Sequence, residues 1–174
     1  QNISSWNTAA VTNMASLFFH AGSFNQNISS WNTAAVTTMQ TMFRGATAFN
    51  QDIENWNTAA VINMSEMFEG ATAFNGELSL WNTSSVTNMR SMFNGATAFN
   101  EDIGETEIRN GWNTAAVTDM SAMFIGATAF NQNISNWCVQ NNFNSEPSNF
   151  KTSANNTWAN DASKQPDWDG ASCP

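Results

Sequence analysis

Few side chains in this sequence could carry out chemistry. Its 174 residues include one histidine, His20, and two cysteines, Cys138 and Cys173. Nucleophilic catalysis needs a nucleophile, a base and an orienting group in one place, and these residues do not supply them. Glycosidase chemistry needs a pair of carboxylates, but ordinary solvated charge explains the densest carboxylate cluster more simply. That cluster comprises Glu101, Asp102, Glu105 and Glu107. We therefore expect no enzyme activity.

Side chains with oxygen atoms recur at nearly regular intervals along the sequence. Such a series could form a calcium site. Calcium takes about six to eight oxygen ligands. Neither the spacing of an EF-hand loop nor a glycine-rich calcium-binding repeat occurs in the sequence. We therefore expect these side chains to be exposed to solvent, and we expect no metal and no other cofactor. They are Asn27, Asp52, Glu77, Asp102 and Asn133.

The two cysteines bracket the last part of the chain. Because they are the only two and flank a segment with few core residues, we predict a disulfide between Cys138 and Cys173. Closing a loop of 34 residues would contribute on the order of 3 to 4 kcal/mol in the chain-entropy model. Such a bond would indicate an oxidising, extracytoplasmic compartment. The aromatic residues expected to pack this segment are Phe143, Phe150, Trp158 and Trp168.

One repeated unit must position all of these side chains. Successive tryptophans are separated by 25, 25, 25, 31 and 25 residues. A period of this size is typical of a solenoid, in which each coil buries its apolar side against its neighbours. The tryptophans are Trp6, Trp31, Trp56, Trp81, Trp112 and Trp137.

Spacing within the unit predicts its secondary structure. Val61, Met64, Met67 and Phe68 recur at intervals of three and four residues, which predicts a helix of about two turns that ends at a glycine. The residues around each tryptophan predict a brief strand, and strands of successive coils would pair in parallel about 4.8 Å apart. The tryptophan, methionine and phenylalanine columns would fill the core.

These elements predict an α/β solenoid of about five coils of 25 residues over residues 1–137. Residues 138–174 lose the period and would form a disulfide-tethered C-terminal cap, because a solenoid needs an atypical end to cover its last coil.

The complete pattern is Ile-x-x-Trp-x-Thr-x-x-Val-x-x-Met-x-x-Met-Phe-x-Gly-Ala-x-x-Phe-Asn. It resembles the repeat of bacterial surface proteins in the BspA-like branch of the leucine-rich repeats. The resemblance spans residues 1–137 and implies a leucine-rich-repeat-like α/β fold, an extracellular surface location and a role in adhesion or binding without catalysis. Two departures are His20, which replaces a glycine of the other coils, and an insertion at residues 104–111.

The charge composition of the chain limits the classes of partner that it is expected to bind. The formal net charge is -9, and only five residues are Lys or Arg. Nucleic acids and anionic membranes are bound through Lys and Arg, so neither is an expected partner. No apolar run approaches the roughly 18 residues of a membrane span, so we expect no membrane insertion in this segment.

Candidate ligand-binding residues are those that follow each tryptophan, because a strand through the tryptophan would point them outward. An equally good alternative is an asparagine ladder, whose amides satisfy backbone groups between coils. The exposed face would comprise Asn7, Asn32, Asn57, Asn82 and Asn113, with Ser30 and Asn55 beside them.

We therefore expect a secreted or cell-surface module that binds an extracellular glycan or a surface protein through this repetitive face, and through the insertion at residues 104–111. An ice-binding protein that uses regular ranks of Asn, Thr and Ala is the first alternative, and a passive structural stalk is the second. The ligand and the oligomeric state stay open.

Overall fold

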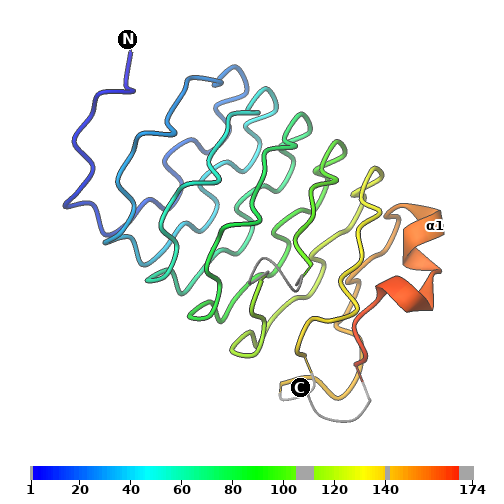
Figure 1. Ribbon diagram of the computed structural model, residues 1–174. Helices are drawn as coiled ribbons and strands as arrows, with labels where there is room; N and C mark the ends of the chain where they lie inside the picture. Colours follow the sequence, from blue (N-terminus) through cyan, green and yellow to red (C-terminus); the bar gives the residue numbers. More distant parts are fainter. Residues whose placement is uncertain (1, 105–111, 140–141, 169–174) are drawn as a thin grey trace.

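A computed structural model describes residues 2–104, 112–139 and 142–168 (Figure 1). The chain winds into a row of similar coils, each lying against the next, and the short helices of the C-terminal segment cover one end of the row. Equivalent aromatic rings of neighbouring coils stack nearly parallel to one another. The Trp31 and Trp56 rings, for example, are 6.5 Å apart between centroids and 1° from parallel.

Each coil is a series of tight turns. In the coil of residues 28–49, six backbone N–H groups each donate to the carbonyl three residues earlier, at 2.9–3.2 Å. The donors are Trp31, Val36, Met42, Arg44, Ala46 and Phe49. Such i to i+3 bonds define consecutive turns rather than an α-helix, which requires bonds to the fourth preceding residue.

The N–H groups between these turns bond to the next coil instead. Met39, Thr41, Phe43 and Gly45 donate to carbonyls of the following coil at 2.7–3.0 Å. Equivalent N–H groups of the other coils donate in the same direction, from the earlier coil to the later one. A separate N–H group of each inner coil, such as that of Thr37 to the carbonyl of Thr12, donates to the preceding coil at 2.8–2.9 Å. Alternate backbone groups therefore build the coil and join the coils together.

Two left-handed residues per coil make this alternation feasible. Thr41 has a φ of 54° and Gly45 a φ of 69°. The equivalent residues of the other coils also have positive φ, including His20 at 55°, which takes the place of the glycine. A left-handed conformation costs a residue with a Cβ atom roughly 1–2 kcal/mol. The hydrogen bonds to the next coil offset this cost, because without them the alternate N–H groups would lose their partners.

The predicted α/β class is wrong. The described residues contain no sheet, and neighbouring coils share only isolated parallel bridges, Asn13 with Thr38, Thr38 with Asn63, Asn63 with Asn88, and Asn88 with Asp119. Neither the helix predicted over residues 61–68 nor the strand predicted around each tryptophan forms. The described helices are the α-helix α1, Asn156–Ala159, and the 3-10 helix η1, Ala162–Lys164. The leucine-rich-repeat-like architecture is therefore corrected to a stack of turn-built coils.

The predicted core is confirmed. The tryptophan, methionine and phenylalanine columns are buried in the inner coils. Polar atoms within this core are paired between coils: Trp56 Nε1 donates to the carbonyl of Ile28 at 3.2 Å, and Thr58 Oγ1 donates to the carbonyl of Asn82 at 2.9 Å. The first coil is more open, since Trp6 is 51% exposed and Leu17 and Phe19 are each 46% exposed.

The coil geometry continues past the last repeated tryptophan. Asn149 and Ser153 have φ values of 56° and 57°, and the carbonyls of Ser148, Phe150 and Thr152 accept from the preceding coil at 2.8–3.0 Å. Residues 148–155 thus copy the turns of a repeat without its sequence. The buried indole of Trp158 then packs edge-on against the rings of the last full coil. Phe150, Trp158 and Trp168 are buried as predicted, and Phe143 is partly buried.

Cys138 is disulfide-bonded in the structure. Cys173 lies outside the described residues, so the pairing of these two cysteines stays a prediction. Within the described residues, no helix is long and apolar enough to cross a membrane.

The left-handed positions make a direct test of the coil geometry. Gly95 has a φ of 70°, and a Cβ atom there would make only ordinary contacts, the nearest at 3.7 Å from Gly70. We expect Gly95→Ala to lower the free energy of unfolding by about 1–2 kcal/mol, measured by urea denaturation, because the cost comes from φ alone. Gly22→Ala is the matched control, since Gly22 is not in the left-handed region and a Cβ atom there would lie 3.4 Å from Thr47 Oγ1. Equal losses in both variants would contradict this account.

Candidate functional site: the exposed asparagine turns

The asparagine that follows each of the first five repeated tryptophans is exposed. Its side-chain Oδ1 accepts a hydrogen bond from the backbone N–H two residues later, at 3.0–3.1 Å. This is an Asx turn, which fixes the side chain against its own backbone. The five residues are Asn7, Asn32, Asn57, Asn82 and Asn113.

These five side chains keep their amide N–H groups available. Within the described residues, none of their Nδ2 atoms donates a hydrogen bond to a protein group. The five residues therefore form a row of fixed, solvent-facing donors, one for each coil. These side chains do not form an asparagine ladder, since each Oδ1 bonds within its own coil.

An asparagine ladder does exist, at a position that sequence reasoning missed. The Oδ1 atoms of Asn25, Asn50, Asn75 and Asn100 accept from the backbone N–H of the equivalent asparagine in the next coil, at 2.7–2.9 Å. The sequence feature that indicates this ladder is the asparagine that follows the last phenylalanine of every coil. Sequence alone does not distinguish the two columns, because both are invariant among the repeats.

The neighbouring positions are also exposed, but they differ from coil to coil. Asn55 is exposed, and Ser30 is exposed while its hydroxyl donates to the carbonyl of Ser4 at 2.8 Å. The equivalent residue of the next coil is Leu80, which is 55% exposed. The regular donor array therefore consists of the asparagine turns, and Ser30 and Asn55 lie beside it.

The oxygen-bearing column is exposed as predicted, and most of it serves local turns. Asn27, Asp52, Asp102 and Asn133 each accept from a backbone N–H two residues later, at 2.9–3.0 Å. A cavity of ≈ 360 Å³ beside this column has Glu54 among its lining residues. The described residues place no group of three or more His, Cys, Asp or Glu side chains where they could hold a metal ion.

The residues considered for catalysis lie apart. His20 is exposed, and its ring contacts the ring of Phe19 edge-on at 4.2 Å. Glu101 accepts a hydrogen bond from the side-chain amide of Asn75 in the ladder. Glu105, Glu107 and the insertion from residue 105 to 111 lie outside the described residues.

A cluster of charged side chains around Arg44 joins neighbouring coils. Arg44 pairs with Glu66 and with Glu69 of the next coil, the second contact being 3.4 Å between Nε and Oε2. Its guanidinium also lies 5.7 Å from the Phe19 ring of the previous coil. Burial raises the pKa of the Glu69 carboxyl above its ordinary value of 4.5, and the nearby Glu66 raises it further, although Arg44 lowers it in part.

This pKa shift makes stability depend on pH. Folded Glu69 binds its proton at a higher pH than unfolded Glu69, so its contribution is present below pH 4.5 and is lost as the pH rises through the raised pKa. Gln resembles the protonated carboxyl. We therefore expect Glu69→Gln to gain stability relative to wild type between pH 4 and pH 7, measured by urea unfolding at both values.

Asp161 supplies a control of opposite sign. Hydrogen bonds from the Ser163 hydroxyl and N–H hold the pKa of Asp161 below its ordinary value, so its contribution is lost as the pH falls. The contribution of Asp161 is lost only as the pH falls below its ordinary pKa of 3.8, so Asp161→Asn should lose stability relative to wild type on going from pH 2 to pH 7. The same trend in both variants would contradict the assignment of these shifts.

The two asparagine columns differ in what they stabilise. Asn75→Ala would leave the partly buried N–H of Asn100 without its acceptor, and we expect a loss of about 1–3 kcal/mol in unfolding free energy. Asn57→Ala would remove an exposed bond that water replaces, so its loss should stay below about 1 kcal/mol. Urea denaturation of both variants tests the assignment, and a larger loss for Asn57→Ala would reverse it.

Fold and surface together define a repeat protein whose coils are joined by backbone and side-chain hydrogen bonds. The family model described as "Mycoplasma protein of unknown function, DUF285" matches residues 1–106 and residues 51–162. The chain belongs to this family. No curated protein and no solved structure matches the chain.

This match also corrects the resemblance inferred from the repeat motif. The description of the matching model names a Mycoplasma protein family and not the BspA-like leucine-rich repeats, and it states no function. The α/β architecture that the resemblance implied is likewise absent from the described residues. The chain is a repeat protein as predicted, but the leucine-rich-repeat fold that the resemblance implied is wrong.

Proposed function

We propose that this protein is a non-catalytic, extracellular surface module that binds a glycan or a protein through the row of asparagine turns. The observation that supports this most is the set of exposed Nδ2 donors on Asn7, Asn32, Asn57, Asn82 and Asn113, each held by an Asx turn. Glycan hydroxyls and protein carbonyls are acceptors that such donors recognise.

Binding through this row would depend on many weak contacts. One exposed amide hydrogen bond contributes about 0.5–1.5 kcal/mol. Because the Asx turn already restricts each side chain, little conformational entropy is lost on binding. A long ligand that contacts successive coils gains from each additional contact, because every contact after the first is intramolecular.

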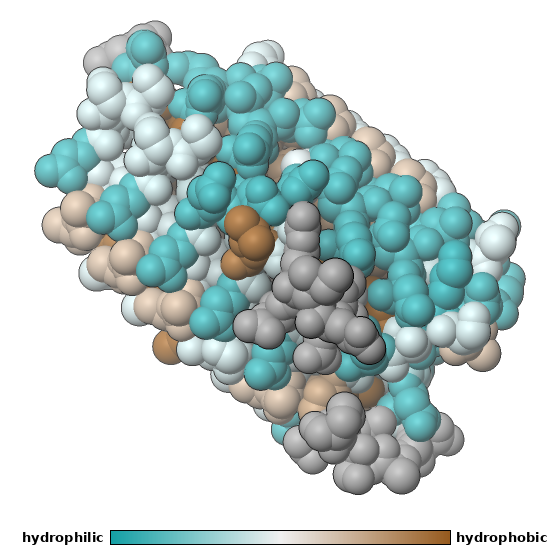
Figure 2. All heavy atoms as spheres, viewed as in Figure 1, coloured by the Kyte–Doolittle hydropathy of each residue, from teal (hydrophilic) through white to brown (hydrophobic). Residues whose placement is uncertain are grey.

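The surface has the polarity that such a ligand requires. Charged residues are 11% of the chain, and one face is dominated by hydrophilic residues with few apolar ones among them (Figure 2). The disulfide at Cys138 fits the proposed secreted or cell-surface location, because disulfides persist in oxidising compartments.

A second candidate is ice binding, favoured by a separate rank of exposed threonines. Each hydroxyl donates to the carbonyl of the residue one coil earlier, at 3.1–3.4 Å, which gives the rank a regular spacing. The rank comprises Thr47, Thr72, Thr97 and Thr128. Ice recrystallisation inhibition measured on the intact protein separates this candidate from the first.

The binding test uses a substitution that preserves the turn. The carboxylate of Asp accepts the backbone N–H as Asp52 and Asp119 do, but it offers no donor. We expect the triple change Asn32→Asp, Asn57→Asp and Asn82→Asp to abolish binding of any ligand found on a glycan array or by pull-down with surface proteins. The urea midpoint should stay close to that of wild type.

The double change Asn27→Asp and Asn133→Asp is the matched control, because it adds carboxylates to exposed Asx turns of another column. It should bind like wild type. Undiminished binding by the triple variant would move the site away from the asparagine turns, and absence of any ligand would leave the passive stalk as the better account.

A further inference from the structure

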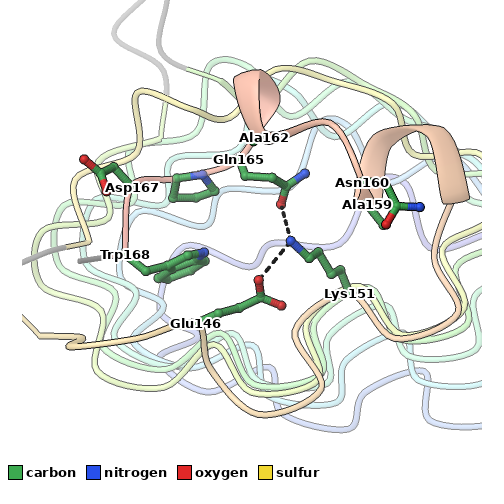
Figure 3. A pocket seen from close by; sticks show the side chains of 9 residues that line it. Glu146, Lys151, Ala159, Asn160, Ala162, Gln165, Asp167 and Trp168 are labelled. Atoms are coloured by element: carbon green, nitrogen blue, oxygen red, sulfur yellow. Dashed lines mark hydrogen bonds and ion pairs between the residues drawn. The ribbon is translucent and has the colours of Figure 1, made fainter. Parts of the chain in front are cut away.

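The C-terminal segment contains a cavity of ≈ 530 Å³ that belongs to no repeat coil (Figure 3). Its walls come from η1, from residues on either side of it and from the loop before residue 151. Six polar or aromatic side chains line it: Glu146, Lys151, Asn160, Gln165, Asp167 and Trp168.

Trp168 has a buried donor without a partner. Its side chain is 8% exposed, and its Nε1 makes no hydrogen bond. Every other buried indole in the described residues donates to a carbonyl, as Trp158 does to Gln132 at 2.7 Å. A buried N–H without an acceptor costs about 1–3 kcal/mol. In Figure 3 this nitrogen lies on the side of the ring that faces Lys151.

The polar groups opposite Trp168 form one close ion pair and one weak hydrogen bond with one another. The Lys151 ammonium pairs with Glu146 at 2.9 Å, but its bond to Gln165 Oε1 is 3.5 Å, at the limit for a hydrogen bond. Gln165 itself is buried and held in place, because its Nε2 donates to the carbonyl of Trp158 at 2.9 Å. An oxygen atom inserted here would replace a weak contact and supply an acceptor to Trp168.

The chemistry of the lining favours a neutral hydroxyl. Trp168 and Lys151 are donors, whereas Glu146 and Gln165 Oε1 are acceptors, and a hydroxyl both donates and accepts. The charge of Lys151 is matched by Glu146, and Asp167 adds a negative charge, so the cavity does not attract an anion. The net charge of -9 works against anions as well.

We propose that this cavity binds a neutral sugar residue. One sugar hydroxyl accepts from Trp168 Nε1 and Lys151 Nζ and donates to Gln165 Oε1 or Glu146. The ring of Trp168 packs edge-on against Phe150 at 5.0 Å and Phe143 at 5.6 Å, so recognition uses its N–H group. This site is independent of the asparagine turns and does not rest on the function proposed for them.

The indole N–H signals of the ¹⁵N-labelled protein give a direct readout. Methyl α-D-glucopyranoside, methyl α-D-mannopyranoside and methyl N-acetyl-β-D-glucosaminide serve as probes, titrated into the full chain. We expect at least one of them to shift the Trp168 indole N–H signal saturably, with a Kd in the millimolar range. Trp168→Phe assigns the signal by its loss, and it should also abolish the binding.

Two lysine variants test the geometry of the site. Lys151→Met keeps the aliphatic stem and removes the ammonium, so we expect the affinity to fall about tenfold. Lys164→Met is the matched control, because Lys164 donates to Asn131 at 2.9 Å and is not among the described residues that line the cavity. It should bind like wild type.

Three further results decide the proposal. No shift of the Trp168 signal with any of the three sugars would overturn it, as would unchanged affinity in Lys151→Met. The triple variant of Asn32, Asn57 and Asn82 should bind these sugars normally, which separates failure of this site from failure of the asparagine turns. If Trp168→Phe unfolds the segment, the wild-type titration and Lys151→Met decide the outcome.

Discussion

The structure depends on how each coil divides its backbone N–H groups between two uses. One set closes the turns of the coil, and the alternate set donates to the next coil. Neither set alone would satisfy the buried backbone, since unpaired amide groups inside a protein cost free energy. The left-handed residues follow from this division, because they rotate alternate peptide groups out of the coil, at a residue with a Cβ atom such as Thr41 and again at Gly45.

Side chains also form hydrogen bonds that join neighbouring coils. Trp56, Thr58 and Asn75 each bond to a backbone group of an adjacent coil, and the equivalent residues of the other coils repeat these bonds. A residue whose partner lies one coil away must recur in each coil, which is a physical reason for the near-identity of the repeats. Recurrence in every coil therefore does not by itself mark a column of side chains as functional. The side chains of Asn32 and Asn57 bond within their own coil, whereas the side chain of Asn75 bonds to the next coil.

The C-terminal segment keeps the backbone conformation of a coil, although its sequence does not match the repeat. Asn149 and Ser153 adopt the left-handed positions, and neighbouring carbonyls accept the last N–H groups of the repeats. The described residues after 155 do not continue the coil; they form α1 and η1 and, together with Glu146 and Lys151, line a cavity. Trp168 is the exception among the buried tryptophans in having an unpaired indole N–H, and it lies in that cavity.

The sequence by itself determined that this is a repeat protein and which residues fill its core. These conclusions rest on periodicity and polarity, which report directly on which side chains must avoid water. Only the tertiary structure decided the secondary structure and the role of each polar column. Val61, Met64, Met67 and Phe68 have helical spacing, yet the neighbouring coil accepts from alternate N–H groups and turns at left-handed residues replace the helix. Likewise, Asn57 and Asn75 have the same chemistry, and only the position of the adjacent coil decides which of them bonds across it.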